Sequence, residues 1–323
     1  MNIKMKKKFK ILAVVLLMGS ITSWSADNSI YIDQAGDNAT ITMTQDGAGN
    51  RIRSIQGIGT GNATPAKIKG DGLSVDIQQL GSGNVLNLGI NTTTANGSSP
   101  TSVKYKVDGN NAVATIDVNN GGNGTSQSNF IDIDQKGNDT VANVNVLGAT
   151  NSLEVFQDGA GNKIFATINA TDVVATVNQT LGSANETTLN LTGDKGTVDI
   201  VTTGATNIID VTQAGGAANG NWVKMLVNGS GNQLTTDQSG MYDNTVDLKI
   251  VGSGNQLTVT QSGGSSLGQY AKVDISGPSG SPSMGAGSNN IIAINQSGAV
   301  DNTTNLKISG SGNQYTINQR KTN

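Results

Sequence analysis

The residues best placed for acid–base chemistry are Asp132 and Asp134, two carboxylates that alternate with Ile131 and Ile133. Two carboxylates at close range can divide a proton transfer between an acid and a base. The alternation instead predicts a strand whose polar residues face outward. The chain has no His and no Cys, which excludes Ser-His-Asp triads, thiol nucleophiles and Cys/His zinc sites. We therefore expect no enzyme activity, no cofactor and no metal.

The side chains that recur at regular spacing are amides. Glutamine returns at gaps close to multiples of about 11 residues, which indicates internal repetition. The residues two and four positions before each glutamine are apolar in 22 of 24 cases. The residue six positions before is Asn in nine of twelve cases, and the residue two positions after is Gly in nine of twelve. The glutamines are Gln34, Gln45, Gln56, Gln79, Gln135, Gln157, Gln179, Gln213, Gln238, Gln261, Gln296 and Gln319, and the asparagines are Asn28, Asn50, Asn129, Asn151, Asn207, Asn232, Asn255, Asn290 and Asn313.

This pattern defines two alternating strand phrases. The first reads Asn-x-Φ-x-Φ-x-Gln-x-Gly, where Φ is apolar, and its period of two residues indicates a strand. The second, as in residues 244–252 and 302–310, has a third apolar residue in place of Gln. Gly- and Asn-rich segments such as 252–255 join the two phrases, and these residues tolerate the positive φ of tight turns. One repeat is therefore strand–turn–strand–turn, about 22–23 residues long.

These repeats predict an all-β fold, a β-solenoid or cross-β stack of two parallel sheets with about 13 rungs. Burial of the apolar side chains of a lone repeat stabilises it by roughly 8–10 kcal/mol. This does not offset the conformational entropy lost in ordering about 22 residues, which costs about 1–2 kcal/mol for each. Stacking continues the apolar column and lets each inward amide bond to its copy on the next rung. Turn insertions rich in Gly, Ser and Pro are expected near 60–72, 92–100, 119–128, 262–269 and 277–289.

The first 25 residues differ from the rest. A basic start, the apolar run ILAVVLLMG and the small residues before Ala26 predict a secretory signal peptide at 1–25, followed by one repeat domain at 26–323. We expect the chain to be secreted. Its pI near 4.9 gives no basic surface for nucleic acid, so no nucleic-acid partner is expected.

Asn28–Asn50, which reads NSIYIDQAGDNATITMTQDGAGN, resembles the curlin repeats of curli fibre subunits, and the similarity extends over essentially all of 26–323. The resemblance implies a major or minor curlin that crosses the outer membrane through its secretion machinery. Such a chain polymerises with itself and with other curlin-like subunits into a pilus-like extracellular amyloid fibre, which serves biofilm matrix, adhesion and colonisation of host or matrix surfaces. The glutamines and asparagines named above would be its amyloid-ladder residues.

Three features depart from that family pattern. The chain is about twice the expected length. The stretch between signal peptide and first repeat is nearly absent, because the first phrase begins at Asn28. Many second phrases carry Leu, Ile or Val in place of a second Gln. These departures keep a second hypothesis open, a monomeric secreted β-solenoid adhesin that binds a ligand through loops such as 277–289.

Overall fold

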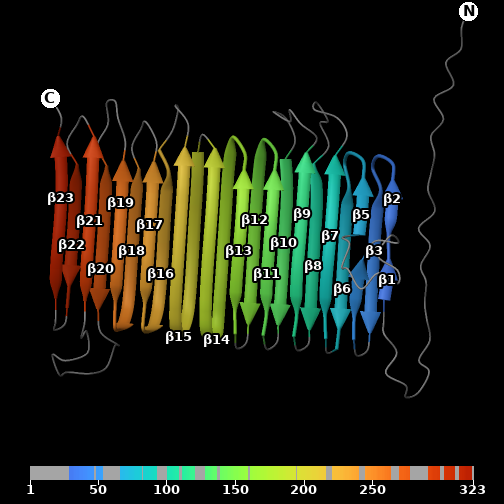
Figure 1. Ribbon diagram of the computed structural model, residues 1–323, viewed down its shortest axis with the longest axis horizontal. Helices are drawn as coiled ribbons and strands as arrows, with labels where there is room; N and C mark the ends of the chain where they lie inside the picture. The colour runs from blue at the N-terminus through green and yellow to red at the C-terminus, as the bar shows by residue number, and fades with distance from the viewer. Residues whose placement is uncertain are drawn as a thin grey trace, which may run out of the picture.

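The computed structural model describes residues 29–321, apart from 47–48, 54–65, 82, 93–99, 109–110, 121–127, 137–138, 159–160, 194, 216–219, 240–243, 263–268, 277–289, 299–301 and 310–312. The predicted signal peptide and Asn28 lie outside the described residues. The described chain is all-β, and its strands lie side by side in sequence order from β1 to β23 along one axis (Figure 1). No helix long and apolar enough to cross a membrane occurs among the described residues.

The alternating sequence forms strands because each strand buries one face. In β12 (Thr150–Asp158), Leu153 and Val155 are almost fully buried, whereas Glu154 is exposed. Strands that follow one another in sequence belong to opposite sheets, except that β1 with β2 and β4 with β5 share a level of one sheet, and each strand pairs in parallel with the next level of its own sheet. The predicted strand–turn–strand repeat is therefore confirmed.

Two parallel sheets result, which we call sheet I and sheet II. β14 and β15 run through a turn without interruption, so each contributes its first half to sheet II and its second half to sheet I. In sheet I, β1 (Ser29–Tyr31) and β2 (Asp33–Ala35) together form the first level, and β4 (Arg51–Arg53) and β5 (Ala66–Lys69) together form the second. The following levels are β7 (Val85–Thr92), β9 (Val113–Asn120), β11 (Val141–Leu147), β13 (Lys163–Asn169), the second halves of β14 (Asp172–Gly193) and β15 (Lys195–Gly215), β17 (Gln233–Ser239), β19 (Gln256–Ser262), β21 (Ile291–Gly298) and β23 (Gln314–Lys321).

Sheet II begins half a repeat later. It stacks β3 (Thr40–Asp46), β6 (Ser74–Leu80), β8 (Thr101–Asp108), β10 (Ser128–Lys136), β12, the first halves of β14 and β15, β16 (Trp222–Ser230), β18 (Thr245–Ser253), β20 (Tyr270–Ser276) and β22 (Thr303–Ile308). The described strands therefore give twelve levels in sheet I and eleven in sheet II. The expectation of about 13 rungs is close to the twelve levels of sheet I that the described strands form.

The insertion predicted at 60–72 is partly wrong. Its Ala66–Lys69 portion is strand β5, which completes the sheet I level that β4 begins. β7 spans both, because Leu86 pairs with Ile52 and Leu88 pairs with Ala66. The extra residues are therefore inserted within one level of the sheet. Of the other predicted insertions, residues 93–99, 121–127, 263–268 and all of 277–289 lie outside the described residues. Thr92, residues 119–120, Ser128 and Ser262, at the edges of these insertions, belong to the flanking strands.

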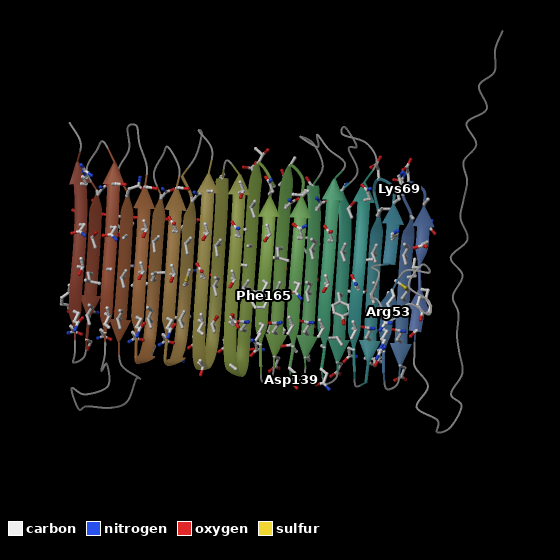
Figure 2. The ribbon with its side chains drawn as sticks, in the orientation of Figure 1. Arg53, Lys69, Asp139 and Phe165 are labelled. Carbon is white, nitrogen blue, oxygen red and sulfur yellow. The ribbon has the colours of Figure 1, made fainter. Side chains whose placement is uncertain are left out.

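The core is a thin apolar layer between the two sheets. Ile, Val, Leu and Ala side chains fill it from one end of the stack to the other, and Tyr105 is the largest fully buried side chain among the described residues. Figure 2 shows the side chains in regular rows that run across the strands, with Phe165 labelled on β13. Since neighbouring rungs are in register, every residue type repeated in the sequence becomes a column in the molecule.

Candidate functional site: the amide ladders and the ends of the stack

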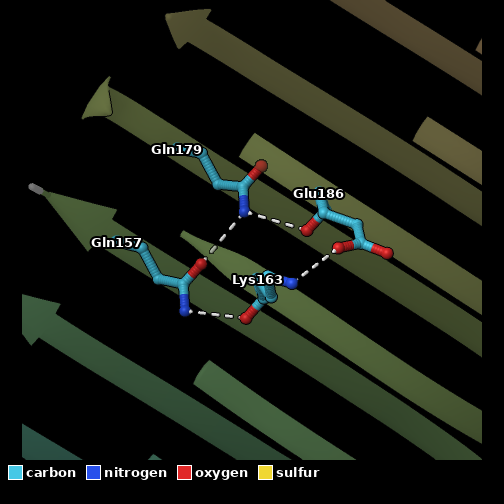
Figure 3. Close-up of polar contacts among 4 residues, drawn as sticks. All are labelled: Gln157, Lys163, Gln179 and Glu186. Atoms are coloured by element: carbon cyan, nitrogen blue, oxygen red, sulfur yellow. Dashed lines mark hydrogen bonds and ion pairs between the residues drawn. The ribbon is translucent and has the colours of Figure 1, made fainter. Parts of the chain in front are cut away.

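A buried glutamine ladder runs along the stack, and Gln157 is a typical member. Its Nε2 donates to the Gln135 Oε1 at 2.9 Å and to the Lys163 carbonyl oxygen at 3.1 Å. Its Oε1 accepts from the Gln179 Nε2 at 3.0 Å. Figure 3 shows both kinds of contact, together with the ion pair between Lys163 and Glu186 on neighbouring rungs. Both amide hydrogens and the amide oxygen of this buried side chain therefore have partners, as burial requires.

Six ladder glutamines link the previous rung to the opposite sheet. In each of them one amide hydrogen donates to the glutamine of the previous rung, and the other donates to a backbone carbonyl just beyond the turn that leads into the opposite sheet. These six are Gln79, Gln157, Gln179, Gln238, Gln261 and Gln296. The ladder therefore fixes the register between rungs and the geometry of the turn together. The rung-to-rung bonds are Gln79 to Gln45 (2.7 Å), Gln157 to Gln135 (2.9 Å), Gln179 to Gln157 (3.0 Å), Gln238 to Gln213 (2.8 Å), Gln261 to Gln238 (3.0 Å), Gln296 to Gln261 (2.9 Å) and Gln319 to Gln296 (3.1 Å).

The ladder changes sheets in the middle of the molecule. From Gln45 to Gln179 it lies in sheet II, where Val107 interrupts it between Gln79 and Gln135, and from Gln213 to Gln319 it lies in sheet I. Beyond Gln179, the sheet II column continues with Thr202, and the sheet I residue before Gln213 is Leu191. The Gln213 Nε2 is buried and has no hydrogen-bond partner among the described residues; the residue on the preceding rung is Leu191, whose side chain cannot accept a hydrogen bond. The sequence signal is the gap of 34 residues between Gln179 and Gln213, which is one repeat plus a half.

Hydroxyl groups complete the ladder at several places. The Tyr105 hydroxyl donates to the Gln79 Oε1 at 2.6 Å, Thr187 donates to the Gln179 Oε1 at 2.9 Å, and Thr304 donates to the Gln296 Oε1 at 3.2 Å. Sequence reasoning missed these three residues. They stand at positions of the apolar alternation, and only a three-dimensional register brings them opposite a glutamine.

Asparagines at the starts of strands also bond from rung to rung, in a pair in sheet II (Asn129 and Asn151) and in longer rows in sheet I. Among the predicted asparagines, Asn129 donates to Asn151 at 2.8 Å, and Asn207 donates to Asn185 at 2.7 Å. Asn50 instead donates to the carbonyl oxygens of Gln45 and Leu80. The remaining rung-to-rung bonds between these asparagines are Asn232 to Asn255 (2.7 Å), Asn255 to Asn290 (3.0 Å), Asn290 to Asn313 (2.7 Å), Asn185 to Asn162 (3.1 Å) and Asn84 to Asn50 (3.4 Å).

Several buried amides were not in the predicted set. Asn84, Asn162 and Asn185 bond to other asparagines as just described, and the signal that could have found them is the Asn that starts several of the second phrases. Asn221 and Asn244 act differently. Their Oδ1 atoms accept from the backbone N–H of the previous rung, Gly196 at 3.0 Å and Asn221 at 3.1 Å. These amides therefore satisfy the backbone where the strand begins.

Two predicted glutamines do not fit the ladder as expected. Gln34 pairs with Ile68 on the next rung of sheet I, so it faces no second glutamine within the chain. Gln56, like Asn28, lies outside the described residues, and the insertion around it brings Ile68 to the ladder position of that level.

The carboxylate pair considered for acid–base chemistry stands on the outer face of β10. Asp132 and Asp134 are half-buried there. Burial raises the pKa of Asp132, while Lys104 on the neighbouring rung opposes that shift. A shallow depression of about 400 Å³ lies on the opposite sheet, lined by residues such as Thr115, Asn143 and Phe165, and neither carboxylate lines it.

The two ends of the stack expose the interior pattern. At one end β23 leaves Tyr315 52% and Ile317 42% exposed, although their alignment continues the core column of β21. At the other end Ile30, Ile41 and Met43 are only partly buried. Each end strand also has one backbone edge that no described strand pairs. Unpaired edges of this kind can accept a further strand.

The ladder itself ends at an acceptor. The Gln319 Nε2 donates to the Gln296 Oε1 and to the Thr304 hydroxyl at 2.9 Å, so both amide hydrogens point back into the stack. The Gln319 Oε1 accepts no hydrogen bond from any described residue. This end of the described stack therefore presents the same acceptor that Gln213, Gln238, Gln261 and Gln296 each offer to the glutamine of the next rung.

Comparison with protein-family models, with curated proteins and with solved structures finds no match to this chain.

Proposed function

We propose that this chain is a secreted structural subunit that polymerises end to end into an extracellular curli-like amyloid fibre. The observation that carries the proposal is the exposed final rung, where β23 repeats the inward pattern of β21 and β19 and leaves both its edge and the Gln319 Oε1 without partners. A second copy can therefore add by the same contacts that join rungs within the chain. The function is structural, with no catalytic turnover.

The numbers of levels in the two sheets determine how a second copy can join the first. Sheet I has one level more than sheet II among the described strands, so β23 stands half a rung above β22. The next open position lies above β22 in sheet II. A second copy whose first strand, β1–β2, fills that position must be turned by about half a revolution about the stack axis. Without this rotation, one strand position of sheet II would stay empty at each junction and leave backbone groups unpaired.

The half-turn also makes the glutamine ladder continuous. It places β3 of the incoming copy on β23, with Ile41 on Tyr315, Met43 on Ile317 and Gln45 on Gln319. The ladder of one copy ends in sheet I and that of the next begins in its sheet II, and the rotation brings these two columns into line. The change of sheet by the ladder within the chain and the unequal numbers of levels in the two sheets therefore both lead to a junction in which Gln45 of one copy lies on Gln319 of the other.

The resemblance to curlin repeats supports the biological setting of the proposal. Under it the chain crosses the outer membrane after removal of residues 1–25, assembles with itself and with other curlin-like subunits, and contributes to biofilm matrix, adhesion and colonisation of surfaces. The alternating Asn-x-Φ-x-Φ-x-Gln phrases give that resemblance. The described geometry adds the reason that such phrases suit growth, because a column of identical rungs has ends that match its middle.

Seeded growth tests the proposal directly. Thioflavin-T fluorescence is followed on monomeric residues 26–323 with and without preformed fibres, for the parent and for Ile317→Lys. Lysine at this inward position of the final rung buries an unpaired charge at the junction, so we expect seeded growth to slow by more than tenfold. Thr316→Lys is the matched control, since Thr316 is the preceding residue and faces outward.

The outcomes separate the hypotheses. A lag that seeds remove, with growth impaired in Ile317→Lys and kept in Thr316→Lys, supports end-on polymerisation. Thioflavin-T fluorescence that stays constant with and without seeds, from a folded, β-rich monomer, would contradict end-on polymerisation and favour the monomeric adhesin.

A further inference from the structure

The outer face of sheet II carries a row of large side chains on alternate rungs. Phe130, Val174, Trp222 and Tyr270 occupy one column, and each is separated from the next by two rungs. The column residues on the intervening rungs are small hydroxyl residues, namely Ser102, Ser152, Thr197, Thr245 and Thr303. We call this column the platform row.

The members of the row are open to solvent. Trp222 is 50% exposed, Val174 46% and Tyr270 37%, while Phe130 is half-buried. An outward strand position in this protein is usually Thr, Asn, Ser or a charged residue, so large apolar groups at every second rung need a reason beyond the fold. Exposed aromatic side chains in line are typical of binding surfaces, since they offer large contact area at low entropic cost.

The spacing of the row identifies the kind of ligand. Neighbouring rungs lie about 4.8 Å apart, so platforms two rungs apart stand about 9.6 Å apart on a flat face. This is close to the length of one disaccharide unit in an extended β-1,4-linked chain, whose sugar rings present flat C–H faces. From Phe130 to Tyr270 the row covers six rungs, or about 29 Å, which suits three such units.

The charges beside the row favour a neutral ligand. The adjacent outward column contains Lys224 and Lys272, which pair with Asp199 at 3.4 Å and Asp247 at 3.1 Å. Each cation is offset by a carboxylate on the neighbouring rung, so the face has no net basic character for nucleic acid or an anionic membrane. The paired groups and the row's own hydroxyls can instead bond to sugar hydroxyls beside each stacked ring.

We propose that the platform row binds an extended, uncharged β-1,4-linked polysaccharide, the chemistry shared by cellulose and chitin. The chain would lie along the stack axis, with alternate sugar rings on Phe130, Trp222 and Tyr270 and with the intervening hydroxyl residues beneath the rings between. This binding uses the side of the stack and not its ends, so it stands whether or not the chain polymerises.

Binding to microcrystalline cellulose and to chitin particles tests the proposal, with amylose, a coiled α-1,4-linked glucan, as the negative polymer. Residues 26–323 contain a single tryptophan, Trp222, so its fluorescence reports the row directly. The monomer is used fresh, and again as Ile317→Lys so that polymerisation does not contribute. We expect Trp222→Ala and Tyr270→Ala each to weaken binding about tenfold. Ile208→Ala and Ile291→Ala remove comparably exposed apolar residues from sheet I, and they should leave binding unchanged.

A second variant tests spacing separately from hydrophobicity. Trp222→Thr combined with Thr245→Trp keeps the composition but moves the tryptophan to the rung next to Tyr270, and it should bind as poorly as Trp222→Ala. Val174→Tyr fills the remaining platform and should tighten binding. The proposal is overturned if the parent binds neither β-1,4-linked polymer, if it binds amylose equally well, or if the exchanged variant keeps parental affinity. It is also overturned if Trp222→Ala changes self-association in sedimentation instead of glycan binding, since a second copy would then be the occupant.

Discussion

A single ladder glutamine supports three partners. Replacing Gln157 by Ala leaves the Gln135 Oε1, the Lys163 carbonyl and one Gln179 N–H without their bonds in a fully buried site. Because a buried polar group that loses its partner costs about 1–3 kcal/mol, we expect Gln157→Ala to lower the free energy of unfolding by about 3 kcal/mol or more. Urea unfolding of the monomer, followed by circular dichroism, measures this change. Asn145→Ala is the control, because it removes an exposed rung-to-rung bond to Asp117 and should cost less than about 0.5 kcal/mol.

The buried tyrosine of the ladder should give the molecule a pH dependence in alkali. Burial raises the pKa of the Tyr105 hydroxyl well above its ordinary value of 10.0. Below pH 10 the phenol is protonated in both the folded and the unfolded chain, and its contribution to stability is complete. Above pH 10 only the unfolded chain ionises, so the free energy of unfolding falls by up to about 1.4 kcal/mol per pH unit.

Tyr105→Phe isolates this effect. The variant loses the bond to the Gln79 Oε1 and should be less stable at neutral pH by about 1–2 kcal/mol, without the additional alkaline decline. Parent and variant are compared by urea unfolding between pH 8 and pH 11, and their stabilities should converge as the pH rises. A constant difference across that range would show that Tyr105 does not titrate with unfolding.

At the scale of the strand, glycine columns let rungs approach closely at the turns. Gly204, Gly229 and Gly252 stand above one another. A Cβ on Gly252 would lie far inside the contact distance of the Gly229 carbonyl oxygen, and its φ of +147° is one that other residues rarely adopt. We expect Gly252→Ala to cost more than about 3 kcal/mol in thermal or urea unfolding. Val251→Ala, at the preceding half-buried position, should cost about 1 kcal/mol or less; similar losses for the two variants would contradict the role of the column.

The elements were largely predictable from sequence, because period-two alternation and repeated Gly-Asn turns are local signals. The same pattern placed Ile131 and Ile133 inward and Asp132 outward, as the structure has them. The sheet change between Gln179 and Gln213 was not predicted, since it follows from counting half-repeats across 34 residues. The split level of β4 and β5 was missed for a related reason. A strand interrupted by an insertion has two short pieces, and neither shows enough alternation to reveal that they continue each other.

At the scale of the whole molecule, the half-turn junction predicts which residues of two copies meet. With the half-turn, Thr316 of one copy lies beside Thr42 of the next; without it, Thr316 lies beside Tyr31. The chain has no cysteine, so an introduced pair reports contacts between copies without background. Parallel neighbouring strands are about 4.8 Å apart, within the Cα separation that a disulfide spans.

Fibres grown from Thr316→Cys/Thr42→Cys should therefore form disulfide-linked chains of many copies under mild oxidation, seen on non-reducing gels. Thr316→Cys/Tyr31→Cys should stay monomeric on the same gels, although its fibres form equally well. All three positions face outward, so the introduced thiols leave the core column intact. Cross-linking through Tyr31 alone would show that copies add without rotation and leave a strand position empty. Cross-linking through Thr42 would instead establish that each copy is turned by half a revolution relative to the copy before it. Sheet I of one copy would then continue as sheet II of the next, as the unequal numbers of levels in the two sheets require.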